Sequence, residues 1–108
     1  MSIKPSYLIR KFGQDITIKI DEAHKEEPSK AIIQPLRWDA QSALYQDYLT
    51  ENITEQFLYI GPPELELSKH IDTAIITANG QRYTLKMAEY VRVGNEVMYE
   101  RAVMEKSN

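Results

Sequence analysis

Two histidines are the side chains of this sequence best suited to bind a metal or to transfer a proton near neutral pH. His24 lies between Glu22 and Glu26 in one polar connection, and His70 lies in another. Neither has a second histidine or a carboxylate at the spacing of a metal site, since the acids beside His24 belong to a charge run typical of a solvated surface. We interpret both as surface histidines and expect no metal or other cofactor.

Catalytic nucleophiles and acid–base pairs are equally poorly supported. The chain has no cysteine, its serines and histidines lack a Gly-x-Ser-x-Gly motif, and its four glycines are isolated from one another, which leaves no phosphate-binding loop. None of the 16 carboxylates is expected in a strongly apolar strand, where loss of solvent would raise its pKa. Asp72 comes closest, but on an alternating strand it should face water. The sequence predicts a protein that is not an enzyme.

Seven tyrosines and one tryptophan suggest a binding surface that stacks on bases or sugars. Tyr83, Tyr90 and Tyr99 fall on expected strands, and each has an arginine nearby. Tyrosine is also a favoured strand residue that packs its ring and hydrates its hydroxyl, and we prefer this interpretation. The residues that we expect to contact other subunits or partners are Glu22, His24, Lys25, Glu26, Glu27, Lys30, Arg82, Tyr90 and Arg92.

Length and charge narrow the classes of function. The 108 residues make one domain, with the 43% apolar and 27% charged residues of an ordinary globular protein. A formal net charge of −3 argues against general binding to a phosphate backbone. An acidic wall repels DNA, however, and would suit a conduit through which DNA slides. No signal peptide or membrane-spanning segment is expected, because apolar runs are only three or four residues long.

Most of the elements that must position these residues read as β-strands. Residues 16–20 alternate apolar and polar side chains, which is typical of a half-buried strand, and residues 7–12 are expected to pair with them across Gly13. Asn79-Gly80 predicts a tight hairpin turn, because a type I′ turn needs positive φ at both positions. A second turn is expected at Gly94-Asn95. The other predicted strands cover residues 31–36, 53–60, 71–77, 82–93 (bent near 88) and 96–104, with a helix over 96–105 as the competing prediction for the last.

The rest of the chain is expected to connect these strands. Residues 21–30 contain a single apolar side chain and a proline, which predicts a mobile polar loop that could dock on a neighbouring subunit. A short helix is predicted over 39–49, and residues 105–108 are expected to form a flexible tail. The predicted fold is therefore mainly β, a small antiparallel β-barrel or sandwich-like sheet of five to seven strands with one short α-helix.

Several short segments follow one another in a characteristic order. Strands ending in Ile33-Gln34-Pro35 and Tyr59-Ile60-Gly61 are followed by Asn79-Gly80-Gln81-Arg82-Tyr83 and by a closing Tyr99-Glu100-Arg101-Ala102-Val103. This pattern, over roughly residues 30–104, resembles the head-completion, or stopper, proteins of tailed phages and their relatives in defective prophages of Gram-positive bacteria. In that family Gly-x-x-Tyr and a last strand with Tyr-x-x-Ala stand at similar places.

The resemblance implies a structural virion protein of the head–tail junction. It would be monomeric when free, in the host cytoplasm, and would form a ring, commonly a hexamer or dodecamer, in the phage or phage-like particle. Its partners would be other connector and tail proteins, with double-stranded DNA passing through and no membrane involved. Two alternatives stay open, namely a small OB-like binding module for a protein or a single-stranded nucleic acid, and a tail-terminator or minor tail protein.

Overall fold

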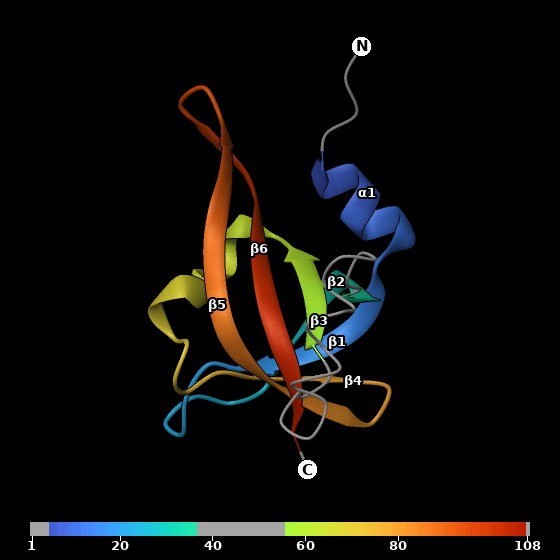
Figure 1. Ribbon diagram of the computed structural model, residues 1–108, viewed down its shortest axis with the longest axis vertical. Helices are drawn as coiled ribbons and strands as arrows, with labels where there is room; N and C mark the ends of the chain where they lie inside the picture. The colour runs from blue at the N-terminus through green and yellow to red at the C-terminus, as the bar shows by residue number, and fades with distance from the viewer. Residues whose placement is uncertain (1–4, 37–55, 108) are drawn as a thin grey trace, which may run out of the picture.

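A computed structural model of the chain describes residues 5–36 and 56–107 (Figure 1). The helix predicted over 39–49 and the first part of the strand predicted over 53–60 lie outside the described residues.

The described residues form a closed antiparallel β-barrel. Its strands, in the barrel order β1-β2-β3-β6-β5-β4, close through pairing of β1 with β4. The predicted fold class, a small antiparallel barrel with a short helix, is confirmed. The strands are β1 (Gln14–Lys19), β2 (Glu27–Pro35), β3 (Gln56–Gly61), β4 (Ile75–Ala78), β5 (Gln81–Val93) and β6 (Glu96–Ser107).

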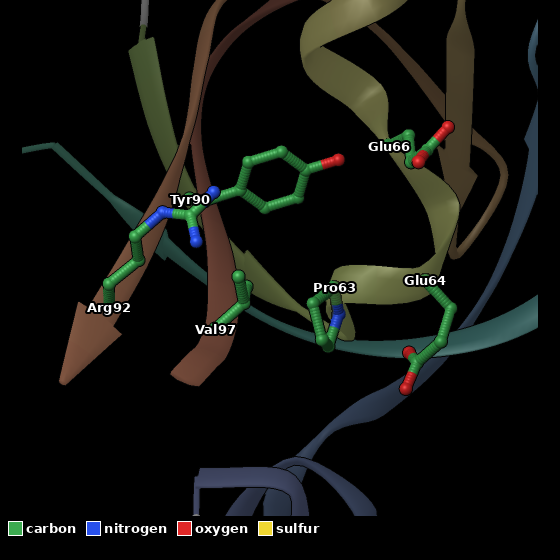
Figure 2. A pocket seen from close by; sticks show the side chains of 6 residues that line it. All are labelled: Pro63, Glu64, Glu66, Tyr90, Arg92 and Val97. Atoms are coloured by element: carbon green, nitrogen blue, oxygen red, sulfur yellow. The ribbon is translucent and has the colours of Figure 1, made fainter. Parts of the chain in front are cut away.

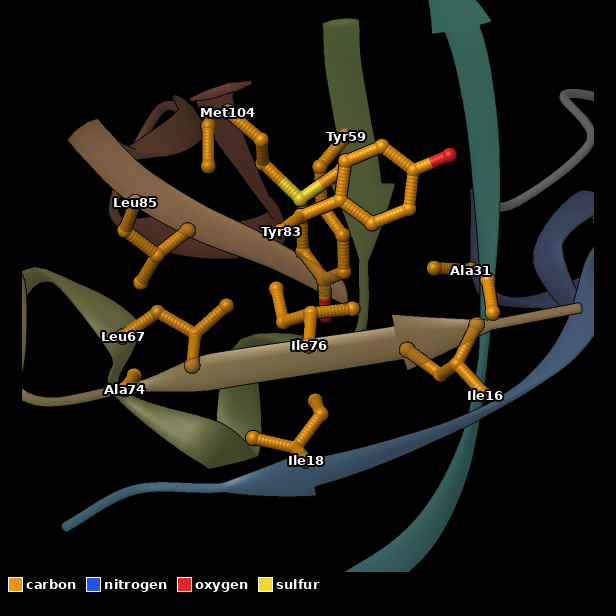
Figure 3. Packing of buried hydrophobic residues seen from close by; sticks show 12 residues of the cluster. Ile16, Ile18, Ala31, Tyr59, Leu67, Ala74, Ile76, Tyr83, Leu85 and Met104 are labelled. Atoms are coloured by element: carbon orange, nitrogen blue, oxygen red, sulfur yellow. The ribbon is translucent and has the colours of Figure 1, made fainter. Parts of the chain in front are cut away.

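Alternating side chains fill the barrel. Ile16 and Ile18 of β1 are buried, whereas Thr17 between them is not, as the period of two predicts. Residues from the other strands meet them in the interior, where the largest fully buried apolar side chains are Tyr59, Leu67, Ile76 and Met104 (Figure 3). Leu67 comes from the connection between β3 and β4, so this connection closes one end of the core.

The segment before β1 is a helix, and the predicted strand over 7–12 is wrong. Helix α1 (Pro5–Phe12) buries Ile9, while Tyr7 and Phe12 stay exposed. Basic residues occupy its last turn, where the helix dipole favours them. Gly13 ends the helix by donating its N–H to the carbonyl of Ile9 at 2.8 Å, and any Cβ at this position would overlap that carbonyl oxygen. No helix in the described parts of the chain is long and apolar enough to cross a membrane.

The polar segment predicted as a loop over 21–30 is only partly a loop. Residues 27–30 belong to β2 and pair with β1, with Ile18 opposite Glu27 and Asp15 opposite Lys30. Side chains on a solvent-facing strand can all be polar, because the backbone supplies the ladder hydrogen bonds. The connection is therefore confined to residues 20–26. Pro35 ends β2, as predicted.

The C-terminal strands differ from the prediction at their ends. Strand β4 begins at Ile75, because residues 71–73 form a turn in which Ala74 donates to the carbonyl of His70 at 2.8 Å. Strand β6 excludes the competing helix over 96–105, and residues 105–107 of the predicted flexible tail are paired within it. The bend expected near Ala88 corresponds to a register shift between Leu85 and Met87. Both hairpin turns are confirmed, with positive φ at Asn79, Gly80 and Gly94.

Candidate functional site

Strands β5 and β6 run on past their pairing with β4 and β3 as a hairpin arm, defined here as residues 85–99. Residues 85–90 still pair with β6 residues of the barrel wall, and residues 91–99 extend beyond it. Thr84 is the last residue of β5 that pairs with β4, and Glu100 is the first of β6 that pairs with β3. Beyond these points the two strands pair only with each other among the described residues. Figure 1 shows the arm rising from one end of the barrel. Its outer edges therefore resemble the unpaired edges of an open sheet.

Two apolar side chains of the arm are unusually exposed. Met87 is 40% and Val93 is 67% exposed. An ion pair between Glu89 and Arg101 lies across the same two strands. Exposed apolar residues beside unpaired strand edges are typical of surfaces that another polypeptide covers.

A cleft lies between the arm and the connection that follows β3. This connection contains two short 3-10 helices, η1 (Pro63–Leu65) and η2 (Leu67–Lys69). The cleft has a volume of about 340 Å³. Figure 2 shows its lining residues, which are Pro63, Glu64, Glu66, Tyr90, Arg92 and Val97.

Charges of both signs face this cleft. The guanidinium carbon of Arg92 lies 5.9 Å from the centre of the Tyr90 ring, close enough for a cation–π interaction. Glu64 and Glu66 stand on the opposite wall (Figure 2). Glu66 turns the chain between η1 and η2 with a left-handed φ of 51° and pairs with Lys69 at 3.1 Å. The cleft can thus receive a segment that carries both acidic and basic side chains.

Glu100 is buried at the base of the arm and holds the start of η2, which directly follows the cleft residue Glu66. Its carboxylate accepts the backbone N–H of Leu67 at 2.9 Å and that of Ser68 at 3.0 Å. Burial raises the pKa of Glu100, and these two hydrogen bonds offset part of the increase. The expectation that no carboxylate lies in an apolar strand is therefore wrong. The alternation of β6 indicates this burial, because Glu100 lies on the same face of the strand as the buried Ala102 and Met104.

Tyr59 lies beside Glu100 in the barrel. The Tyr59 hydroxyl is buried and has no hydrogen-bond partner in the part of the chain that the structure describes. Burial, and next the charge of Glu100, raise the pKa of this phenol. Its ring extends over Gly61, where a Cβ would overlap it. The glycine that precedes the two prolines therefore makes room for a core side chain.

The connection between β1 and β2, called here the polar loop (residues 20–26), is a hydrogen-bonded turn. The Asp21 carboxylate accepts the backbone N–H of Ala23 at 2.9 Å and of His24 at 3.0 Å. The same carboxylate lies 2.6 Å from Nδ1 of His24, and this hydrogen bond is the main reason that the pKa of Asp21 is lowered. The Thr73 hydroxyl donates to the carbonyl of Ile20 at 2.6 Å. These bonds give the loop a defined shape.

The structure separates the predicted contact residues into four places. Tyr90 and Arg92 meet in the cleft, and Arg82 is exposed on β5 opposite Thr77 and Ser107, apart from them. The polar loop carries Glu22, His24, Lys25 and Glu26, and β2 carries Glu27 and Lys30. The opposite wall of the cleft was not predicted. The only signal for it was the acidic, leucine-containing stretch after Pro62-Pro63.

Comparison of the chain with protein-family models, curated proteins and solved structures finds no match. Among residues 5–36 and 56–107 no group of three or more histidines and carboxylates is placed to hold a metal ion.

Proposed function

We propose that the protein is a structural, non-enzymatic subunit that assembles into a ring, as expected of a head–tail connector of a tailed phage or prophage-like element. Its partners would then be further copies of itself and other connector and tail proteins, in the host cytoplasm and later in the particle. The observation that carries the proposal is the hairpin arm, whose outer edges have no strand partner among residues 5–36 and 56–107 and which exposes apolar side chains.

The closed barrel directs assembly to this arm. A closed sheet has no free edge, so strand pairing between subunits, within the described residues, is confined to the arm and the rims of the barrel. Covering a side chain such as Val93, which is 67% exposed, would remove apolar surface from water. Complete burial of a valine-sized side chain is worth about 1.5–3 kcal/mol. Several such contacts around a ring make assembly favourable.

The charge of the chain also supports a conduit for DNA. The formal net charge is −3, so the subunit as a whole repels a phosphate backbone. DNA could then pass a ring of such subunits without adhering to it.

The alternative of an OB-like module for single-stranded nucleic acid has weaker support. An OB-fold is a five-stranded barrel, and this one has six strands in the order β1-β2-β3-β6-β5-β4. The aromatic residue and the arginine that could stack on a base, Tyr90 and Arg92, share the cleft with Glu64 and Glu66. Carboxylates in that position would repel a phosphate backbone.

Native mass spectrometry and sedimentation velocity, from micromolar to millimolar protein, test the proposal. We expect a monomer at low concentration and one closed oligomer at high concentration, without a ladder of intermediate sizes. The double variant Met87→Thr/Val93→Thr should stay monomeric. Phe12→Thr, which changes a side chain 66% exposed on α1, should assemble normally. A wild-type protein that stays monomeric at millimolar concentration, or that binds single-stranded DNA in a salt-dependent way, would contradict the ring.

A further inference from the structure

We propose that the cleft of one subunit binds the polar loop of the next subunit, so that the ring is built from head-to-tail contacts. This inference rests on the ring function proposed above and adds a second pair of surfaces to the contact at Met87 and Val93.

The two surfaces are different parts of the molecule. Figure 1 shows the tip of the arm at the top of the view and the polar loop, in light blue, at the lower left. A contact between two different surfaces is heterologous, and repeating it closes a ring or extends a filament. A contact between identical surfaces would stop at a dimer. Because the loop and the cleft are different surfaces, their contact can be repeated from subunit to subunit around a ring.

Each surface carries individual charges that can pair with opposite charges on the other, while both contain more acidic than basic side chains. The loop exposes Lys25 between Glu22 and Glu26, and among the described residues none of these three side chains makes an ion pair or a hydrogen bond. The cleft exposes Glu64 on one wall and Arg92 on the other. Lys25 can pair with Glu64 while an acidic residue of the loop pairs with Arg92. Such complementarity fixes the register of an interface and disfavours wrong partners.

The loop is shaped before it binds. Three hydrogen bonds to the Asp21 carboxylate and one from Thr73 to Ile20 hold the turn, so less conformational entropy is lost on binding. Ala23 is exposed near its tip, and its small side chain can enter between the apolar Pro63 and Val97. The opposite wall is equally fixed, because Glu100 holds η2 in place. Two prearranged surfaces are therefore available for one contact.

Charge reversal tests the contact. Lys25→Glu and Glu64→Lys each place like charges opposite one another, and we expect either change to weaken assembly about tenfold or more, which corresponds to about 1.4 kcal/mol. The double variant Lys25→Glu/Glu64→Lys restores an attractive pair in every contact, so its assembly should return to near the wild-type level. Lys11→Glu changes the net charge equally on α1, outside both surfaces, and should have little effect. Circular dichroism would verify that all variants are folded.

Mixing the two single variants gives a sharper readout. In an equal mixture, the unchanged cleft of the Lys25→Glu chain accepts the unchanged loop of the Glu64→Lys chain, and the two altered surfaces also attract each other. We expect rings that contain both chains in a one-to-one ratio, seen by native mass spectrometry, although neither chain assembles alone.

The outcomes separate this inference from the ring function. If the wild-type protein assembles but single reversals have no effect, or if neither the double variant nor the mixture recovers, the loop–cleft contact is wrong and the ring function stands. If the wild-type protein does not assemble at millimolar concentration, the ring function fails and the contact fails with it.

Discussion

Glu100 and Leu67, 33 residues apart in the sequence, are joined by a hydrogen bond of 2.9 Å between a carboxylate oxygen and a backbone N–H. Together with the bond to Ser68, it ties the connection after β3 to the base of the hairpin arm. The shape of the cleft thus depends on one buried carboxylate.

Glu100→Ala should therefore destabilise the fold. The change leaves the backbone N–H groups of Leu67 and Ser68 without their acceptor, which costs about 1–3 kcal/mol of the free energy of unfolding. Urea denaturation at neutral pH measures this loss. Glu96→Ala, an exposed glutamate on the same strand, is the control and should change the free energy by about 0.5 kcal/mol at most. Equal stabilities of the two variants would mean that the buried carboxylate has no structural role.

The stability of the protein should also depend on the ionisation of Glu100. Burial raises its pKa in the folded state above the ordinary value of 4.5. The folded protein then binds this proton more tightly than the unfolded chain, so the contribution to stability is fully present below about pH 4.5 and is lost as the pH rises through the folded-state pKa.

Glu100→Gln cannot titrate and isolates this effect. We expect the free energy of unfolding of the wild type, minus that of Glu100→Gln, to fall as the pH is raised from about 4 to 7. Parallel urea titrations across this range give the difference at each pH. A difference that grows with pH would show that the two backbone hydrogen bonds outweigh burial and lower the pKa instead.

Gly61→Ala should lower stability through a collision with the Tyr59 ring. The added Cβ would overlap the hydroxyl and the nearest ring carbon, and overpacking of this kind costs about 1–3 kcal/mol. Tyr59→Phe removes a buried hydroxyl that has no partner among the described residues, so alone it should cost little. The double variant should recover part of the loss, because the missing oxygen is the atom that the Cβ meets first. Thermal denaturation of the four proteins measures this coupling, and strict additivity would count against the collision.

Gly80→Ala should weaken the hairpin between β4 and β5. Gly80 has φ of +77° and its Cβ position is in open space, so only backbone strain opposes the substitution. That strain is worth about 1–2 kcal/mol for an L-residue in the left-handed region. D-alanine at the same position, introduced by chemical synthesis, should relieve it, because its preferred φ is positive. Thermal melts that rank the two enantiomers equally would rule out strain as the cause.

The sequence predicts the parts of this fold that depend on local patterns. Alternation predicts that Ile16 and Ile18 lie in the interior, and Asn79-Gly80 predicts the turn between β4 and β5. The strand predicted over 7–12 is wrong although this segment carries local helical signals. Pro5 opens the helix, and Leu8, Ile9 and Phe12 fall at helical spacing.

The candidate site was predictable on one side only. Tyr90 and Arg92 form an aromatic–arginine pair on a predicted strand. Their partners across the cleft belong to a connection about 25 residues earlier in the chain, and the long-range pairing of β3 with β6 brings that connection to the arm. Glu100 was misjudged for a related reason. Its burial follows from the alternation of β6. The hydrogen bonds that it accepts from Leu67 and Ser68, however, depend on how the connection between β3 and β4 crosses the end of the barrel.

The pairing of β1 with β4 also bears on how the protein is made. Thr17 pairs with Thr77, so the outer edge of β1 has no strand partner until most of the chain has left the ribosome. The β4–β5 and β5–β6 hairpins need only local contacts and can form within microseconds once synthesised. Closure of the barrel then requires β1 to pair with β4, which is distant in the sequence, and such pairing is slow. Until it occurs, the unpaired edge of β1 is exposed and prone to aggregation. Nascent chains that stall before residue 77 should therefore be the ones that need a chaperone.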